Sequence, residues 1–100
     1  MHPEYDIQYL KTAECDLYGI FDYIGQDNPL AAAALLDKID NSISYLATNP
    51  YLGVVPKDTR LRNKGYRMLI VEKYLVFYVI KSKTIQIRRV IHGARGYTFL

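Results

Sequence analysis

The hydrophobic and polar positions of this chain alternate with two different periods, which predict different secondary structures. Tyr5, Ile7 and Tyr9 alternate with polar residues, and this period of two predicts a short, half-buried strand. From Ala13 onwards the apolar residues recur every three or four positions, which is typical of amphipathic helices. Residues 65–97 return to β-type runs rich in Ile, Val and Tyr. The pattern therefore predicts a strand, then helices, then a sheet.

Two helices are predicted, joined by a three-residue turn. Thr12 can cap the first helix, and Gly25 suits the left-handed turn at its end. Asn28-Pro29 starts the second helix, and Asn49-Pro50 ends it. So short a turn predicts an antiparallel hairpin. The apolar stripes are Ala13, Leu17, Ile20 and Ile24 in the first helix, and Ala32, Leu35, Leu36, Ile39, Ile43 and Leu46 in the second.

The connection from residue 51 to residue 64 has no sustained period and contains Gly53 and Pro56, which predicts a long loop without regular structure. Loops of this length are uncommon in small domains and are often functional. This loop concentrates positive charge, which favours contact with a polyanion. The cations concerned are Lys57, Arg60, Arg62 and Lys64.

The sheet is predicted to be an antiparallel meander of three strands. Residues 66–71 and 74–80 flank Glu72-Lys73, which predicts a two-residue hairpin with Arg67 opposite Tyr78. The next hairpin has two possible loops, the three-residue Lys81-Ser82-Lys83 and the two-residue Ser82-Lys83. Only the three-residue loop gathers the apolar side chains on one face, and burial at roughly 25 cal/mol per Å² favours it.

That register predicts one apolar face beneath the helices and one polar face. The apolar face comprises Met68, Ile70, Leu75, Phe77, Val79, Ile85, Ile87 and Ile91. The polar face comprises Arg67, Tyr74, Tyr78, Gln86, Arg88 and His92. Arg89 falls on the apolar side, from which its long side chain is expected to reach an edge.

Length and composition favour one compact domain, residues 1–100, of the α+β class. Half of the 100 residues are apolar, enough for a single core. No run of 18 apolar residues and no signal-peptide layout is present, so a soluble, cytoplasmic protein without membrane contact is expected. Cys15 is the single cysteine and is interpreted as a packing residue.

Charge divides the chain into two unlike halves. Residues 1–50 carry a net charge of −6, and residues 51–100 carry a net charge of +9. Such asymmetry indicates that the second half meets a polyanion, with nucleic acid or an acidic protein as the candidates. A solvated cationic surface is the alternative.

The residues of the polar face favour phosphodiester chemistry without a metal. Two histidines and one cysteine do not provide the ligand spacing of a zinc site, and no glycine-rich phosphate loop is present. His92 can serve as an acid or base near neutrality, and the guanidinium groups of Arg67 and Arg88 can stabilise a phosphorane. Tyr97 can stack on a base or assist proton transfer. The alternatives are a structural His92 and arginines that only solvate the face.

Four short motifs, in this order, resemble the RelE/ParE superfamily of type II toxin–antitoxin toxins. They are Asn49-Pro-Tyr-Leu-Gly53, Gly65-Tyr-Arg67, Tyr74-Leu-Val-Phe-Tyr78 and Arg89-Val-Ile-His-Gly-Ala-Arg95, and the resemblance covers the chain end to end. It implies a small bacterial toxin held inactive by a cognate antitoxin, without a small-molecule cofactor. The family fold places a strand before a helical hairpin and a three-stranded meander.

The superfamily implies two alternative activities. RelE-like and YoeB-like members cut mRNA on the ribosome with basic residues and a His or Arg and a Tyr near the C-terminus. On this basis we expect metal-free, ribosome-dependent mRNA cleavage, with Arg67, His92, Arg95 and Tyr97 as the catalytic residues. The RNA-binding residues are then Lys57, Arg60, Arg62, Lys64 and Arg88. His92 and Tyr97 are spaced more widely than the adjacent pair of the YoeB type, and Asp58 is a poor counterpart of its carboxylate base. ParE-like members instead poison DNA gyrase without a nuclease site, and the first and last motifs fit that branch at least as well.

Overall fold

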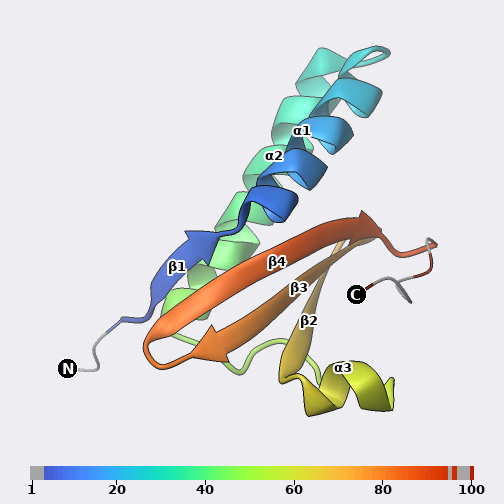
Figure 1. The fold of residues 1–100 in the computed structure, drawn as a ribbon. Helices are drawn as coiled ribbons and strands as arrows, with labels where there is room; N and C mark the ends of the chain where they lie inside the picture. The colour runs from blue at the N-terminus through green and yellow to red at the C-terminus, as the bar shows by residue number, and fades with distance from the viewer. Residues whose placement is uncertain (1–3, 95, 97–99) are drawn as a thin grey trace.

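A four-stranded sheet with a long helical hairpin on one face forms the body of the protein (Figure 1). The computed structural model describes residues 4–94, 96 and 100. The sheet has the order β1-β4-β3-β2, so the last strand lies inside the sheet. The predicted α+β fold class is confirmed. The elements are β1 (Asp6–Tyr9), α1 (Lys11–Gly25), α2 (Pro29–Ser44), the 3₁₀ turn η1 (Tyr45–Ala47), α3 (Thr59–Asn63), β2 (Tyr66–Val71), β3 (Tyr74–Lys81) and β4 (Thr84–His92).

The first helix ends where the sequence predicts but starts differently. Helix α1 ends at Gly25, whereas its N-cap is Leu10, which makes no side-chain capping bond. The predicted cap at Thr12 is therefore wrong. The hydroxyl of Thr12 instead donates to the backbone carbonyl of Arg88 at 2.8 Å, which fastens the start of α1 to β4.

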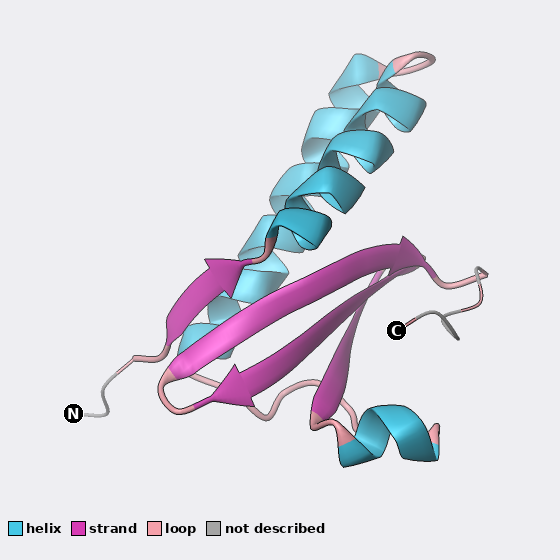
Figure 2. Ribbon diagram, viewed as in Figure 1, coloured by secondary structure: helices cyan, strands magenta, loops and turns pink. Residues whose placement is uncertain are grey.

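The second helix follows the prediction closely. The side chain of Asn28 accepts a hydrogen bond from the backbone N–H of Ala31 at 3.1 Å, and Pro29 occupies the first turn. Ala32, Ile39 and Ile43 are buried along one stripe, as the period of the sequence indicates. Figure 2 shows both helices running side by side and reaching beyond the sheet.

The β2–β3 hairpin has the predicted register, with Arg67 opposite Tyr78 across a Glu72-Lys73 turn. The β3–β4 hairpin does not. Lys81 pairs with Thr84, so the turn is the two-residue Ser82-Lys83 and the predicted three-residue loop is wrong.

A β-bulge in β4 explains why the shorter turn is tolerated. Tyr78 lies opposite Ile87, but Phe77 lies opposite Arg89, so Arg88 has no partner across the hairpin. The extra residue reverses the alternation of β4 from this point on. Consequently Val90 faces α1 and α2 together with Ile87, although an uninterrupted strand would place them on opposite faces.

Both faces of the sheet are therefore apolar, and the predicted division into one apolar and one polar face is wrong. The helix face packs on α1 and α2 through Val71, Val76, Tyr78, Ile85, Ile87 and Val90. The α3 face, on the other side, packs on Leu61 of α3 through Tyr66, Phe77, Val79 and Ile91, with Met68 and Leu75 partly buried beside them.

The long connection contains more structure than its sequence predicts. The carboxylate of Asp58 caps α3 by accepting hydrogen bonds from the backbone N–H groups of Arg60 at 2.9 Å and Leu61 at 3.2 Å. The side chain of Leu61 is fully buried. Val54 forms an antiparallel bridge with Met68 of β2. A short helix with a single apolar anchor has no period to detect, which is why the sequence pattern misses it.

Candidate functional site

Arg67, a predicted catalytic residue, is bound to the loop that precedes α3. Its Nη1 donates to the backbone carbonyl of Gly53 at 2.7 Å and to that of Tyr51 at 3.3 Å. Its guanidinium carbon also lies 4.9 Å from the centroid of the Tyr51 ring, a cation–π distance. The side chain therefore holds the first of the family-like motifs in place.

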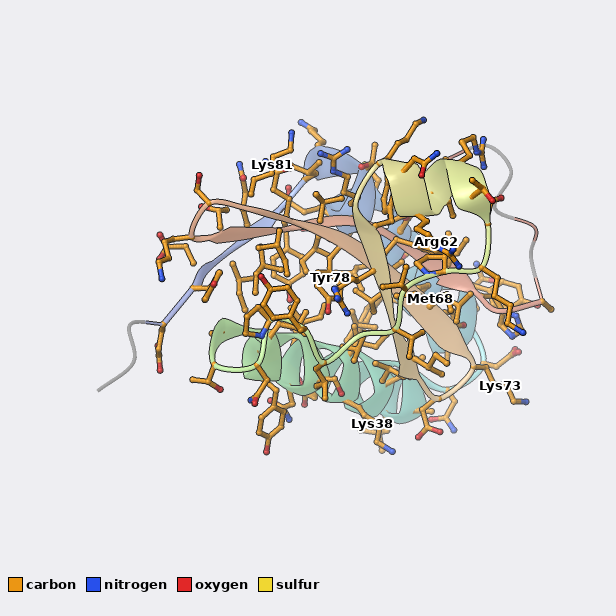
Figure 3. The ribbon with its side chains drawn as sticks, turned by 90° about the horizontal axis from the view of Figure 1, so that it is seen from below. Lys38, Arg62, Met68, Lys73, Tyr78 and Lys81 are labelled. Carbon is orange, nitrogen blue, oxygen red and sulfur yellow. The ribbon has the colours of Figure 1, made fainter. Side chains whose placement is uncertain are left out.

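Tyr78 completes this clamp from β3. Its hydroxyl accepts from the backbone N–H of Gly53 at 2.9 Å and donates to the carbonyl of Pro50 at 2.8 Å. Figure 3 shows Tyr78 inside the molecule, whereas Lys38, Lys73 and Lys81 point outwards at its edges. The pattern of the sequence predicts Tyr78 on the polar face and does not predict this role. The predicted pairing of Tyr78 with Arg67 was the one sequence feature that pointed to this role. Side chains that are opposite each other on neighbouring strands lie close together, and here both reach the same loop.

Replacing Tyr78 with Phe should lower the free energy of unfolding by about 1–2 kcal/mol, because a buried N–H and a carbonyl lose their partner. Burial raises the pKa of Tyr78, so the neutral hydroxyl is favoured in the folded state. The stability it contributes is complete below the ordinary pKa of about 10 and falls as the pH rises above it. Urea unfolding from pH 7 to 11 should show a shallower alkaline loss in the variant. Tyr45→Phe, at an exposed tyrosine, is the matched control and should change little.

His92 lies at the end of β4 and opposite Tyr74. Its ring is exposed and packs edge-on against the Tyr74 ring, with centroids 5.3 Å apart. The Nδ1 atom accepts a hydrogen bond from the backbone N–H of Ala94 at 3.0 Å. This bond assigns the proton of the neutral ring to Nε2. Open cavities of about 460 and 410 Å³ meet at the His92–Tyr74 pair, on the side of α2 and of α1 respectively.

Arg88 occupies the bulge and lies on the α3 face. Its Nη2 donates to the side-chain oxygen of Gln86 at 3.0 Å, and its guanidinium carbon lies 5.7 Å from the centroid of the Tyr66 ring. Its Nε is buried and has no hydrogen-bond partner within the part of the chain that the structure describes. Because Tyr66 packs against Leu61, Arg88 lies close to α3.

The predicted RNA-binding cations gather at and around α3. Lys57 precedes the helix, Arg60 and Arg62 lie in its last turn and Lys64 caps its end, all four with exposed side chains. Arg60 lies 3.9 Å from Asp58. We call these four residues and Arg88 the cationic face. The structure thus brings all five predicted RNA-binding residues to one side of the sheet.

The predicted catalytic residues are not brought together in the same way. Arg67 lies opposite Tyr78, and His92 lies opposite Tyr74, so the two are four residues apart along β3, or about 13 Å, and two strands apart. Both lie on the side of the helices, away from Arg88. Arg95 and Tyr97 lie outside the described residues, so their predicted roles stay predictions.

Residues 4–94, 96 and 100 contain no group of three His, Cys, Asp or Glu side chains that could hold a metal ion. Cys15 is a free thiol on the exposed side of α1, so its predicted packing role is wrong. Within the same described residues, no helix has both the length and the apolar character needed to cross a membrane.

An ion pair that the sequence pattern misses joins α1 to β4 beyond the end of β1. Arg89 donates to the carboxylate of Asp16 through Nε at 2.7 Å and Nη2 at 2.9 Å, and the backbone N–H of Val90 donates to the same carboxylate at 2.9 Å. The hydrogen bonds to Asp16 raise the pKa of Arg89. The long side chain of Arg89 thus ends in an ion pair with α1, and its predicted path to an edge of the sheet stays a prediction.

Comparisons with known proteins identify the class to which this architecture belongs. The family model described as the ParE toxin of the type II toxin–antitoxin system parDE matches residues 7–97. The toxin RelE2 of Caulobacter vibrioides is 34% identical over 83 residues, covering 83% of this chain and 89% of that protein.

Solved structures share the fold. A chain of the chromosomal ParDE toxin–antitoxin system of P. aeruginosa has a TM-score of 0.76 and 22% identity, covering 91% of this chain and 98% of its own. A chain of the RelBE2 toxin–antitoxin complex of Mycobacterium tuberculosis has a TM-score of 0.63 and 23% identity, covering 89% of this chain and 98% of its own. The order of elements, the family match and the likeness to RelE2 agree, and this chain belongs to the ParE toxin family, within the RelE/ParE superfamily of type II toxin–antitoxin toxins.

Proposed function

We propose that this toxin acts as ParE-like toxins do, by binding and poisoning DNA gyrase, and that it does not cut RNA. The observation that carries the proposal is the position of Arg67, whose guanidinium is bound to two loop carbonyls and a tyrosine ring. A guanidinium held in this way fixes a surface loop and is not directed at a phosphate. The match of the ParE model to residues 7–97 supports the same branch.

Ribosome-dependent mRNA cleavage is the second candidate, and the cationic face favours it. Five cations around α3 and the bulge suit the binding of a phosphate backbone. The 34% identity to RelE2 also supports a relation to the RelE branch. In this reading Arg67, His92, Arg95 and Tyr97 would supply the chemistry, and the cationic face would hold ribosomal or messenger RNA.

The variant His92→Ala distinguishes gyrase poisoning from mRNA cleavage. The His92 side chain is exposed, so its removal leaves the core intact. A gyrase poison should keep its toxicity within about twofold, whereas loss of a general acid or base costs 10²-fold or more. Arg67→Ala is a poor diagnostic, since it also releases the loop.

The measurement is primer extension on cellular mRNA after pulsed expression, run in parallel with a gyrase supercoiling assay on the purified protein. The proposal expects intact transcripts, gyrase-dependent DNA breaks and an SOS response from the wild type and His92→Ala alike. Transcripts cut inside codons by the wild type, and spared by His92→Ala, would refute it in favour of cleavage.

We also propose that a cognate antitoxin restrains the toxin, as the toxin–antitoxin complexes among its structural neighbours suggest. We expect an acidic antitoxin segment to bind the cationic face, because unlike charges attract. The helical half of the chain is itself acidic and would repel such a segment.

A further inference from the structure

A group of exposed apolar side chains lies beside β2, on the connection that leads to α3 (Figure 1). The exposed fractions are 64% for Tyr51, 55% for Leu52, 52% for Val54 and 43% for Val55. We call these four residues the apolar patch. Apolar side chains scattered singly are normal on a protein surface, but a contiguous group marks an interaction site.

The backbone of the apolar patch is fixed, although its side chains are exposed. Val54 is held to β2 by two backbone hydrogen bonds with Met68, of 2.9 and 2.8 Å. The carbonyl of Gly53 accepts from Arg67, and its N–H donates to the hydroxyl of Tyr78. The polar groups of this backbone are thus bound within the protein, while the apolar side chains face water. A loop that is ordered before binding loses less conformational entropy on association, so this arrangement favours recognition.

The apolar patch is uncharged, but a cation follows it directly. No charged residue lies between Tyr51 and Pro56, and the next residue is Lys57, which is exposed and belongs to the cationic face. Nucleic acid is held mainly by cations that contact phosphates, so an uncharged patch adds little to binding of that kind. Aromatic and apolar side chains are instead typical of the centres of protein–protein interfaces. The patch therefore fits a protein surface that has an apolar hollow and an acidic border opposite Lys57.

We propose that the apolar patch is the contact by which the toxin binds its protein target, with Leu52 and Val55 entering an apolar hollow and Lys57 facing acidic side chains. The inference rests on the proposed function, in which the target is DNA gyrase, and it adds the surface through which gyrase is bound. The hydrogen bonds of Arg67 and Tyr78 then contribute to binding as well as to stability, because they hold the patch in the shape that the target meets.

The test measures the affinity of the full-length toxin for purified gyrase by surface plasmon resonance, with and without a DNA duplex. Leu52→Asp should weaken binding about tenfold or more, because it places a charge in the apolar hollow. The loss should be the same in both samples, since the apolar patch contacts protein. Lys57→Glu should weaken binding about three- to tenfold, because it sets like charges opposite each other.

Leu30→Asp and Lys11→Glu are the matched controls, because they make the same two changes at exposed residues away from the apolar patch. Leu30 is 84% exposed in the first turn of α2, and Lys11 follows β1, at the opposite edge of the sheet from β2. Both variants should leave the affinity within about twofold. Leu52 is more than half exposed, so Leu52→Asp should keep the fold. If it does not fold, Leu52→Ala takes its place, with an expected loss of about three- to tenfold.

Three outcomes would overturn the inference and leave the proposed function standing. Unchanged affinity of the Leu52 variants for gyrase would place the contact elsewhere, and a loss confined to the samples with DNA would make nucleic acid the occupant. Dimerisation of the toxin alone, seen by sedimentation and abolished by Leu52→Asp but not by Leu30→Asp, would make a second copy the occupant. A wild-type toxin that does not bind gyrase at all would instead refute the proposed function, and this inference with it.

Discussion

Asp16→Ala should lower the free energy of unfolding by about 3 kcal/mol. The Asp16 carboxylate accepts from the Arg89 guanidinium and from the Val90 N–H, and the Asp16 and Arg89 side chains are only 14% and 21% exposed. Removing one partner of a largely buried pair forfeits these hydrogen bonds while the other charge stays desolvated, which costs more than the pair itself contributes. Urea denaturation followed by circular dichroism measures the difference.

Asp22→Ala is the control for this change, because Asp22 is an exposed acid on the same helix. It should change the free energy of unfolding by less than about 0.5 kcal/mol. If the two variants lost the same stability, the junction of α1 and β4 would not depend on the ion pair.

Gly53→Ala should cost about 3 kcal/mol, at the upper end of the range for overpacking. A Cβ atom at this position would lie 2.7 Å from the Tyr78 hydroxyl, 2.8 Å from a carbon of its ring and 3.0 Å from the backbone carbonyl of Met68. Neither the buried ring nor the β2 backbone can move away without breaking the hydrogen bonds of the loop. Thermal unfolding should show a lower midpoint.

Gly19→Ala provides the opposite expectation for the same chemical change. Gly19 lies in α1, and a Cβ atom there would meet nothing within 4 Å. Alanine has the higher helix propensity, so this variant should gain about 0.5–1 kcal/mol. A loss of stability in both variants would indicate that the crowding at Gly53 is not the cause.

The helical half of the fold could be predicted because each signal there is local. Asn28 and Pro29 start α2 through contacts within one turn, and the apolar stripes need only the period of a helix. Thr12 is the exception. Its hydroxyl donates to the backbone carbonyl of Arg88, a residue 76 positions away. The residues around Thr12 in the sequence give no indication of that contact.

The register of β4 could not be predicted from loop length alone. Ile85 and Ile87 share one parity and Val90 has the other, yet all three are buried on the helix face. An uninterrupted strand keeps Ile85, Ile87 and Ile91 on one face, and the three-residue turn was predicted because it sets them beside the apolar residues of the preceding strand. The protein inserts Arg88 as a bulge instead. A change of parity within one apolar run is the signal that would have revealed it.

The candidate site was predicted in part, for a related reason. The cations around α3 are close in sequence, so their grouping follows from the chain itself. Arg67 and His92 do share the helix face, but they lie four residues apart along β3 and on strands separated by β3, whereas the bulge turns Arg88 to the α3 face. The roles of Tyr78 and Asp16 depend on contacts with Gly53 and Arg89 that are distant in sequence.

The place of β4 in the sheet also constrains the synthesis of the protein. β1 is made first, but its only strand partner among the described residues is β4, which is made last. A nascent chain that lacks β4 can form the helical hairpin and the β2–β3 hairpin, but it cannot join them into one sheet. Translation interrupted before β4 should therefore release fragments without the complete sheet, because β4 joins β1 to the β2–β3 hairpin.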